Sequence, residues 1–528
     1  MNDLVPLLAL AAPLAFVVAG AVAARHPGRR PVAAIRATTL ASWLALAVAA
    51  VAGAAVAVAG STSSALVGAG GLGLSVRLDG LSTVMLAMIA LLAVVIVRYS
   101  ATYLDGDDRH GTFLGRLALT IAAVQVLVLS GNLAVLVLAW IATSLTLHQL
   151  LTFYPQRRGA VVAARKKFIV ARIGDAFLVA AAALLHERFG TGELDVLLAG
   201  AGSQLADGFA LGSLELAAAC IAVAAILKSA QFPTHGWLVE VMETPTPVSA
   251  LLHAGILNAG PFLVLRLAGV LDGADVANAL LIVAGGATAL IASVALLPQP
   301  SIKVVLGYSS AAHMGFMLMV CAIGVYPAAF LHLVAHSFYK AHAFLSSGSV
   351  VDEARAAGVS VPRRLGRPAR VAASLGAAGA LYAGFALLWG VDLVRDVELL
   401  AIGAILVLGL AQLLAPALDS DGPVLGGLRA GAMALGVTVA FFALEAGAHH
   451  LLKGTVPEIT GREVAHLVLL GGVLVAFAGV IVLQILEPAR PATGFRRRLA
   501  VHFRNGLYAN ALFDRAVRAL RTPAPTGR

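Results

Sequence analysis

The chain has 528 residues, of which 60% are hydrophobic and only 12% are charged, and its mean hydropathy is +0.92. A soluble domain carries about 25% charged residues, so this composition excludes a soluble globular enzyme. Many apolar segments have the length that crosses a bilayer. The sequence therefore predicts an all-α polytopic membrane protein.

The apolar segments predict about 13 to 15 transmembrane helices. The first segment lacks a basic flank before it and a clear cleavage site, so we expect it to remain as a span and not to be removed as a signal peptide. In chain order the expected spans lie near residues 4–24, 33–60, 78–97, 114–131, 132–152, 166–185, 211–232, 245–268, 276–297, 302–325, 328–350, 370–391, 397–416, 427–447 and 464–486.

The net charge of +10 is unevenly distributed between the two predicted sides of the membrane. Loops on one side hold 17 Lys and Arg, whereas loops on the other side hold 5. Basic loops face the cytoplasm, so we expect the N-terminus outside and the C-terminus inside. This pattern explains the basic charge by orientation, and we expect no nucleic-acid partner. The richer loops are residues 25–36, 98–116, 157–167 and 355–370.

Cysteine chemistry is not expected to shape this chain. Its only cysteines, Cys220 and Cys321, both lie in predicted spans, and no CxxC motif occurs. Neither a disulfide framework nor a thiolate metal site is therefore predicted.

Charged residues inside the spans are costly, at about 2.5–3.5 kcal/mol each near the bilayer centre, and therefore point to function. In the sixth span, Arg172 and Asp175 are three residues apart on one helix face. They can form an ion pair, either to fix helix packing or to serve ion transport.

The seventh span ends in KSAQFPTHGWLVEVMETPTPVSALLHAG, which begins at Lys228. Prolines that follow this lysine predict a broken helix, and a broken helix beside an intramembrane lysine is typical of a transporter binding site. The alternative is that Lys228 reaches the membrane interface. His253 follows in the eighth span, while Glu240 and Glu243 are expected at the interface, paired with basic groups.

The tenth and eleventh spans carry the sharpest polar pattern. His332, His336 and Lys340 recur every four residues, which stacks them on one helix face. A row of protonatable groups can pass protons, although hydrogen-bonded packing histidines are the alternative. In the tenth span, Lys303 can be an ordinary basic flank, whereas His313 lies deeper.

A metal site is a further interpretation of this row, because His332 and His336 have a zinc-ligand spacing. The pattern lacks the glutamate of the HExxH motif and any evident third ligand. We therefore predict no metal and no cofactor in this chain. The less favoured alternative is a membrane metalloenzyme that uses these two histidines.

The segment GFRRRLAVHFRNGLYANALFDRAVRAL in the C-terminal tail alternates basic and apolar residues at helical spacing. Phe495, Leu499, Phe503, Leu507 and Phe513 form the apolar side. The pattern predicts an amphipathic helix on the inner membrane surface or against a partner. A solvated basic tail is the alternative.

Three motifs together resemble the proton-translocating membrane subunits of respiratory complex I and of Mrp-type cation/proton antiporters. They are the segment from Lys228 to Gly255, SIKVVLGYSSAAHMGF, and FLHLVAHSFYKAHAFLSSGSV. The resemblance implies two inverted five-helix repeats with discontinuous helices. It also implies a proton pathway through Lys228, His253, His332, His336 and Lys340, with Lys303 and His313 beside it. Arg172 and Asp175 are implied to tune the charge of Lys228, with Glu240 and Glu243 among the ion-pair residues.

This resemblance implies an organisation in five parts. They are N-terminal transmembrane helices (1–110), a first antiporter-like repeat (111–270), a second repeat (271–416), C-terminal transmembrane helices (417–487) and an amphipathic cytoplasmic tail (488–528).

Two departures from the complex I pattern bear on function. Ile141 stands where the fifth helix of those subunits has a glutamate, and the twelfth span, RVAASLGAAGALYAGFALLWG, has no ionisable residue in its interior. Two groups of the family's second proton half-route are therefore not matched in this sequence.

These departures and the tail segment VHFRNGLYANALFDR resemble the smaller membrane subunit of the DAB-type inorganic carbon accumulation system. That resemblance implies a bacterial inner-membrane subunit that conducts H+ or Na+, without catalytic chemistry of its own. Its implied partner is a large cytoplasmic zinc-binding subunit (the DabA type), similar to a β-carbonic anhydrase, which hydrates CO2 to bicarbonate. The alternative is an antiporter-like subunit of a complex I-like or Mrp-type assembly.

Overall fold

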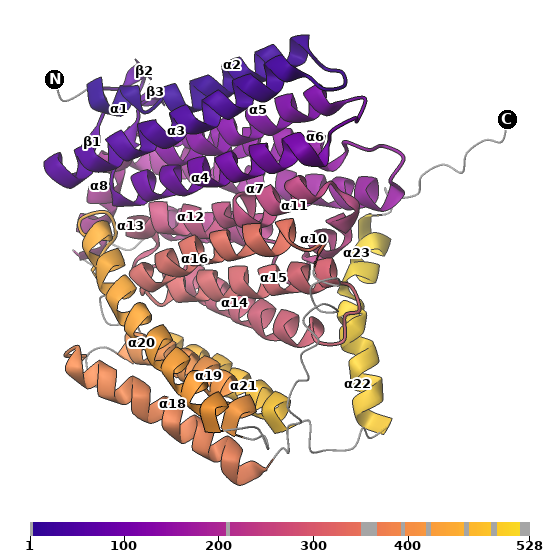
Figure 1. Cartoon of the computed structure of the whole chain (residues 1–528). Coiled ribbons are helices and arrows are strands. Elements are labelled where there is room, and N and C mark those ends of the chain that lie inside the picture. Colours follow the sequence, from indigo (N-terminus) through magenta and orange to yellow (C-terminus); the bar gives the residue numbers. More distant parts are fainter. Residues whose placement is uncertain are drawn as a thin grey trace.

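The computed structural model describes residues 4–206, 212–349, 367–391, 397–418, 424–458, 464–486 and 494–517. In these ranges the fold consists of helices joined by short loops, together with two small β-hairpins (Figure 1). The long helices are α2 (Ala11–Arg25), α3 (Val32–Ala59), α4 (Gly80–Tyr103), α5 (His110–Leu129), α6 (Leu133–Leu151), α7 (Arg158–Phe189), α9 (Gly212–Lys228), α14 (Asp275–Ala295), α15 (Ile302–Ala322), α16 (Tyr326–Leu345), α18 (Pro368–Leu388), α19 (Val397–Leu418), α20 (Val424–Leu452) and α21 (Val464–Leu486).

Shorter helical elements lie between and after them: α1 (Leu4–Leu8), α8 (Leu194–Ala206), α10 (Gly236–Glu240), η1 (Val241–Glu243), α11 (Thr246–Ala254), η2 (Ile256–Asn258), α12 (Ala259–Arg266), α13 (Ala268–Leu271), α22 (Gly494–Arg504), η4 (Gly506–Tyr508) and α23 (Ala509–Val517). The hairpins are antiparallel: β1 (Thr62–Ser63) pairs with β4 (Arg77–Leu78), and β2 (Val67–Ala69) pairs with β3 (Leu72–Leu74).

The prediction of an all-α polytopic membrane protein is confirmed. Among the described residues, twelve helices are long and apolar enough to cross a bilayer. The three other expected spans are also helical: α9 has 17 residues, α16 carries the polar histidine row, and α19 contains the shorter apolar helix Ile402–Leu418.

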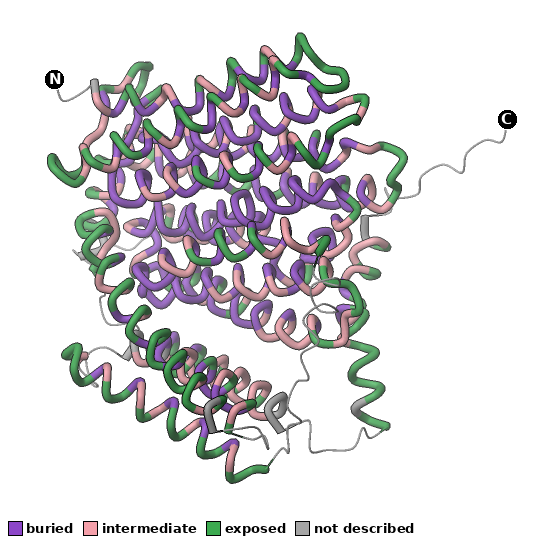
Figure 2. The backbone as a smooth tube through the Cα atoms, in the orientation of Figure 1, coloured by how far each residue is buried: buried purple, intermediate pink, exposed green. Residues whose placement is uncertain are grey.

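Helices α2 to α16 form a large body whose centre is buried, and α18 to α21 lie beside it (Figures 1 and 2). Helix α21 packs on α14, and α20 packs on α16 and α4. Small residues allow the closest helix contacts. A Cβ at Gly285 would lie 2.5 Å from the Gly315 carbonyl oxygen, so α14 and α15 meet along their main chains at this point.

Basic loops gather at one end of the helices, as their charge predicted. Arg29 and Arg30 pair with Asp108 and Asp105 across the loops 25–36 and 98–116. Lys166 contacts the tail helix α23 at the same end, which lies on the right in Figure 1. Residues 355–366, in the fourth basic loop, lie outside the described ranges.

The opposite end is held by a buried ion network that the sequence analysis missed. Asp79 caps the N-terminus of α4 through a hydrogen bond from the Ser82 amide at 2.8 Å. Arg266 lies 2.5 Å from the same carboxylate and Arg77 lies 2.9 Å from it, with Asp79 0% exposed. An arginine within the apolar run PFLVLRLAGV was the available signal, because such a charge needs a buried partner.

Candidate ion-translocation site

Helix α9 breaks directly after Lys228, as the prolines predicted. Residues 229–235 are not helical, and the chain resumes a helix only in the five residues of α10. The freed backbone is satisfied by neighbouring groups, since the Phe232 amide donates to the Thr288 hydroxyl at 2.9 Å. The break thus places the end of α9 inside the protein, where irregular backbone at membrane depth is tolerated. In the second predicted repeat, residues 271–416, the described helices show no such break within their bounds.

Lys228 points into the protein toward α6. Its ammonium donates to the Trp140 carbonyl oxygen at 3.0 Å and to the Thr143 hydroxyl at 3.2 Å. It also lies 4.1 Å from the centre of the Trp140 ring, a cation–π distance. The residue is only 8% exposed, so the alternative that its amine reaches the membrane interface is not the arrangement of this structure.

A second buried lysine, Lys167 of α7, lies beside the first and was missed. Its place in the sequence had assigned Lys167 to the basic loop 157–167. Its ammonium donates to the Ser144 carbonyl and hydroxyl oxygens, both at 2.8 Å. The two lysines therefore bind carbonyl oxygens one turn apart on α6, with Ile141 between those positions. Helical periodicity was the missed signal, because the apolar face through Ala163, Val170 and Leu178 includes position 167.

Arg172 and Asp175 form the ion pair that their spacing allowed, with nitrogen and oxygen 2.5 Å apart. Asp175 is buried on α7, and both residues act electrostatically on Lys228. This arrangement supports a tuning role, which stays a prediction. We call Lys167, Arg172, Asp175 and Lys228, with the α6 oxygens that they contact, the lysine region.

Imidazoles dominate a separate region built on α11, α15 and α16. The His313 Nδ1 atom lies 2.9 Å from the His332 Nε2 atom, and the His313 ring lies 5.0 Å from the His336 ring. His253 bonds the Ser310 hydroxyl at 2.8 Å and stacks on Phe344. We call His253, His313, His332, His336 and Lys340 the histidine region.

Lys340 ends this row of α16. It is 0% exposed and donates to the Leu306 carbonyl oxygen at 3.2 Å. His342, just off the row, is exposed. Lys303 lies apart from the imidazoles and donates to the Thr246 hydroxyl at 3.2 Å, which joins the start of α15 to the start of α11. The structure therefore brings together five of the predicted pathway residues here and places Lys303 at their edge.

Glu240 lies at the basic end and pairs there with Lys166. The Lys166 ammonium lies 2.6 Å from Glu240 and 2.5 Å from Asp514 of α23, and its side chain is 0% exposed. Asn510 of α23 hydrogen-bonds both Glu240 and Lys166. The tail is thus fastened to α10, the short helix that follows the break. Lys166 was not predicted at this site, because its place in the sequence had assigned it to the basic loop 157–167.

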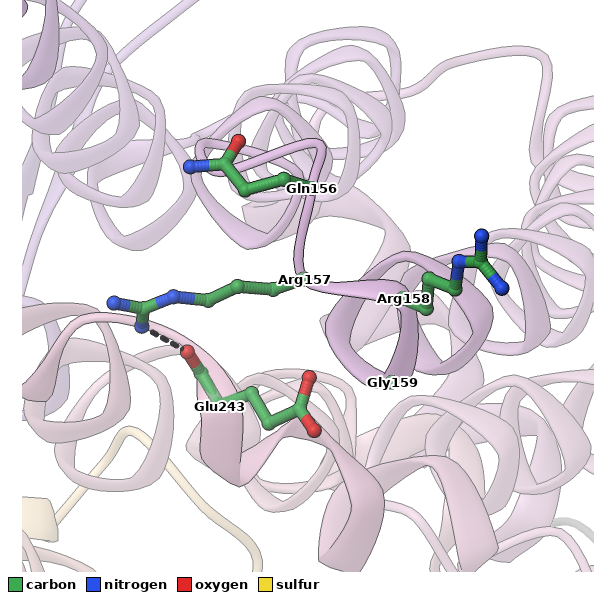
Figure 3. Close-up of a pocket in the computed structure, with 5 residues that line it drawn as sticks. All are labelled: Gln156, Arg157, Arg158, Gly159 and Glu243. Carbon is green, nitrogen blue, oxygen red and sulfur yellow. Dashed lines mark hydrogen bonds between the residues drawn. The ribbon is translucent and has the colours of Figure 1, made fainter. Parts of the chain in front are cut away.

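Glu243 lines an open pocket of about 510 Å³ at the start of α7 (Figure 3). Its carboxylate accepts a hydrogen bond from the Ala160 amide at 3.2 Å, as suits an anion at a helix N-terminus. Arg157 donates to the Glu243 carbonyl oxygen. Both glutamates therefore contact groups at the basic end, and a part for either in tuning Lys228 stays a prediction.

The tail is largely helical, but the single amphipathic helix that its pattern predicted is divided into α22 and α23 by a kink at Leu507, which has φ +52°. Phe495 and Leu499 of α22 are exposed, at 74% and 42%. Phe503 packs on the core, and the Gln299 side chain donates to the Arg504 carbonyl oxygen at 3.1 Å. The C-terminal end of α22 is therefore anchored next to α14, while its N-terminal end presents exposed apolar and basic side chains.

Two family descriptions match the sequence. Residues 130–362 match NADH:quinone oxidoreductase/Mrp antiporter, TM, and residues 67–114 match NADH-Ubiquinone oxidoreductase (complex I), chain 5 N-terminus. These ranges contain the residues of the lysine region and of the histidine region. Both regions therefore lie inside the family's matched segments.

Curated relatives match about half of this chain. The chain is 46% identical over 292 residues to the probable inorganic carbon transporter subunit DabB2 of Halothiobacillus neapolitanus, which covers 55% of this chain and 52% of that protein. It is 36% identical over 286 residues to NADH-quinone oxidoreductase subunit L of Escherichia coli, covering 54% and 46%. The matches thus span about half the length of these relatives.

Solved structures match the fold over almost the whole chain. The Mrp complex of Dietzia sp. DQ12-45-1b aligns with a TM-score of 0.59 and 24% identity, covering 98% of this chain and 61% of that one. Respiratory complex I of Thermus thermophilus aligns with a TM-score of 0.55 and 20% identity, covering 96% and 99%. These solved structures show the same fold, and the family descriptions together with the curated relatives show that the chain belongs to the antiporter-like superfamily of complex I and Mrp membrane subunits.

Proposed function

We propose that this chain conducts protons through a bacterial inner membrane as the membrane subunit of an inorganic carbon uptake complex. The observation that carries the proposal is a set of buried or half-buried amines and imidazoles inside a helical membrane body, in which every member except His336 has a hydrogen-bond partner. Holding such groups in hydrocarbon is costly, and they mark ion pathways in membrane proteins. The similarity to proteins named probable inorganic carbon transporter subunits supports the choice of process.

The proposed pathway connects the lysine region with the histidine region. Lys228 ends α9 before the break, and His253 lies on α11 after it, where it bonds Ser310 of α15. From α15 the imidazoles of His313, His332 and His336 continue the row to Lys340 on α16. Imidazole both donates and accepts a proton, so such a row can relay protons between Lys228 and Lys340.

The proton flux is proposed to drive CO2 hydration by a large cytoplasmic zinc-binding subunit similar to a β-carbonic anhydrase. The tail offers a physical link, because α23 contacts α10 through Lys166 and Asn510. A partner that engages the exposed start of α22 can pull on α23 and thereby on the segment that follows Lys228. In this proposal the C-terminus is cytoplasmic and the N-terminus is outside.

The test is carbon-dependent growth of a host strain that lacks its own uptake system. We expect Lys340→Ala, expressed with the partner subunit, to abolish growth in air, and Lys340→Arg to do the same because arginine does not release its proton. Lys453→Ala, an exposed lysine outside the regions, is the matched control and is expected to support normal growth. Normal growth of Lys340→Ala at equal expression would refute the proposal.

The second candidate function is an antiporter-like subunit of a complex I-like or Mrp-type assembly, favoured by the identity to subunit L of Escherichia coli. Affinity purification of the tagged chain from its own host separates the two candidates. We expect one large zinc-binding partner for carbon uptake, whereas several quinone-reductase or antiporter subunits would support the alternative. Flux assays in proteoliposomes with H+ or Na+ gradients would then identify the coupling ion.

A further inference from the structure

Three histidines from two helices meet within the histidine region. His332 and His336 lie one turn apart on α16, and His313 comes from the neighbouring α15. One ring nitrogen from each lies within 4.8 Å of the others. In the described part of the chain, this is the single group of three or more His, Cys, Asp or Glu residues that meets this criterion. The sequence lacked an evident third ligand, and tertiary packing supplies one.

We propose that His313, His332 and His336 form a binding site for a divalent transition metal of the zinc type, and that bound metal stops ion transfer through the histidine region. This second part rests on the proposed function. The metal-binding part stands on geometry alone.

The spacing of the rings is close to what such an ion requires. Zinc–nitrogen bonds of about 2.0–2.1 Å in a tetrahedron place two ligand nitrogens about 3.3 Å apart. The His313 and His332 nitrogens are 2.9 Å apart, and the third nitrogen needs to move inward by about 1.5 Å or less. Rotation of the His336 side chain supplies such a movement without a change of backbone.

His336 has unused bonding capacity that points to a ligand. It is only 4% exposed, yet neither of its ring nitrogens has a hydrogen-bond partner. A buried polar group without a partner costs about 1–3 kcal/mol. A metal ion, or water in its place, removes that cost, so the cluster is prepared to accept an occupant.

The donor set also selects the kind of ion. Three neutral imidazoles suit zinc, copper or nickel, whereas magnesium and calcium require oxygen ligands. Three protein ligands leave a fourth position open for water. The Lys340 ammonium, one turn further along α16, opposes a bound dication electrostatically, so we expect reversible binding and not a permanent structural ion.

A bound metal is expected to block the relay for a simple reason. Each ligand nitrogen uses its lone pair for the metal and no longer accepts a proton. Because His313, His332 and His336 are consecutive members of the proposed row, one ion interrupts it at three positions. Bound zinc would therefore act as an inhibitor of flux.

The first experiment uses the purified full-length chain in detergent after removal of metals. We expect calorimetry to detect one zinc ion per chain, and X-ray absorption of the zinc complex to show three imidazole nitrogens at about 2.0–2.1 Å. His313→Gln is expected to weaken binding at least tenfold. His342→Gln, which changes an exposed histidine of the same helix, is the matched control and is expected to bind as the original does.

Absence of zinc binding to the unaltered chain would overturn the site, and so would equal affinity in His313→Gln and His342→Gln. If His313→Gln fails to fold, the X-ray absorption result on the unaltered chain decides the question. Oxygen ligands in place of imidazole nitrogens would also overturn the proposal.

The second experiment measures flux in proteoliposomes with and without zinc, using the original chain and His342→Gln. We expect both to be inhibited at the zinc concentrations that saturate the site in calorimetry. Flux that zinc leaves unchanged at saturation would overturn the inhibitory part. Zinc binding without any proton or sodium flux would instead refute the proposed function while leaving the metal site intact.

Discussion

The lysine region and the histidine region bury their charged or polar groups in different ways. In the first, the Lys228 and Lys167 ammonium groups bind fixed carbonyl oxygens on α6. In the second, His313 and His332 bind each other, and His253 binds a hydroxyl. A lysine has three donors and no acceptor, whereas an imidazole has both. The comparison suggests that the lysine region holds charge and the histidine region relays it.

The largest effect is expected from the lysine region. Lys228→Met keeps the length of the side chain but removes the amine, and we expect ion flux in proteoliposomes to fall by at least about 10²-fold, within the range of a lost proton-transfer group. The neighbouring amine of Lys167 is held by Ser144, one turn further along α6. The control is Lys453→Met, expected to retain flux. If Lys228→Met kept more than a tenth of the original flux, the charge of the lysine region would not be essential and the comparison would be wrong.

A smaller loss is expected from a single change in the histidine region. His332→Gln removes one hydrogen bond worth about 1 kcal/mol, which corresponds to about fivefold in rate. Two further imidazoles, His313 and His336, remain beside the gap and water can bridge it. Flux is measured in the same vesicles as for Lys228→Met. A loss as large as that of Lys228→Met would contradict this prediction, because it would show that His313, His336 and water do not bridge the gap.

The third prediction concerns the tail and not the relay itself. Lys166→Met leaves Glu240 and Asp514 without their shared cation, and these carboxylates are partly exposed, at 31% and 42%. A broken buried pair costs about 3–5 kcal/mol, and partial exposure reduces this to about 1–3 kcal/mol. We expect faster protease cleavage within α22 and α23, with lower thermal stability in detergent. Arg165→Met, one residue earlier and exposed, is the matched control. Unchanged cleavage of Lys166→Met would contradict the proposed clamp.

The smallest effect is expected at a polar contact outside both regions. The pKa of Tyr154 is raised to about 12 from its ordinary 10.0. Burial is the largest cause, and the hydrogen bond to Asp107 at 2.6 Å is the second. The raised value favours the neutral phenol, so its stabilisation is present below pH 10 and is lost as pH rises through 12. Tyr154→Phe should cost about 1 kcal/mol or less. The pKa is measured from the difference in tyrosinate absorbance between the original chain and Tyr154→Phe as pH is raised. A Tyr154 phenol that titrates near pH 10 would contradict the raised pKa.

Much of the candidate site could be predicted before the fold was known. Lys228, His332, His336 and Lys340 stand out because charged or titratable residues are rare in apolar spans. Arg266 carried the same signal and was overlooked. The partners of the two lysines could not be predicted, because Trp140 and Leu306 offer carbonyl oxygens that any helix has, and only packing decides which of them face an amine.

Hydropathy, charge asymmetry and proline placement by themselves determined that this chain is a many-helix membrane protein with a break after Lys228, because these properties depend on local free energies of transfer and backbone geometry. Tertiary structure alone decided which partners the adjacent residues Lys166 and Lys167 contact. Successive positions on a helix differ by about 100°, so Lys167 turns toward α6 while Lys166 turns toward the tail. Tertiary structure also brought His313 to His332 and His336, since contacts between helices depend on packing that no single segment encodes.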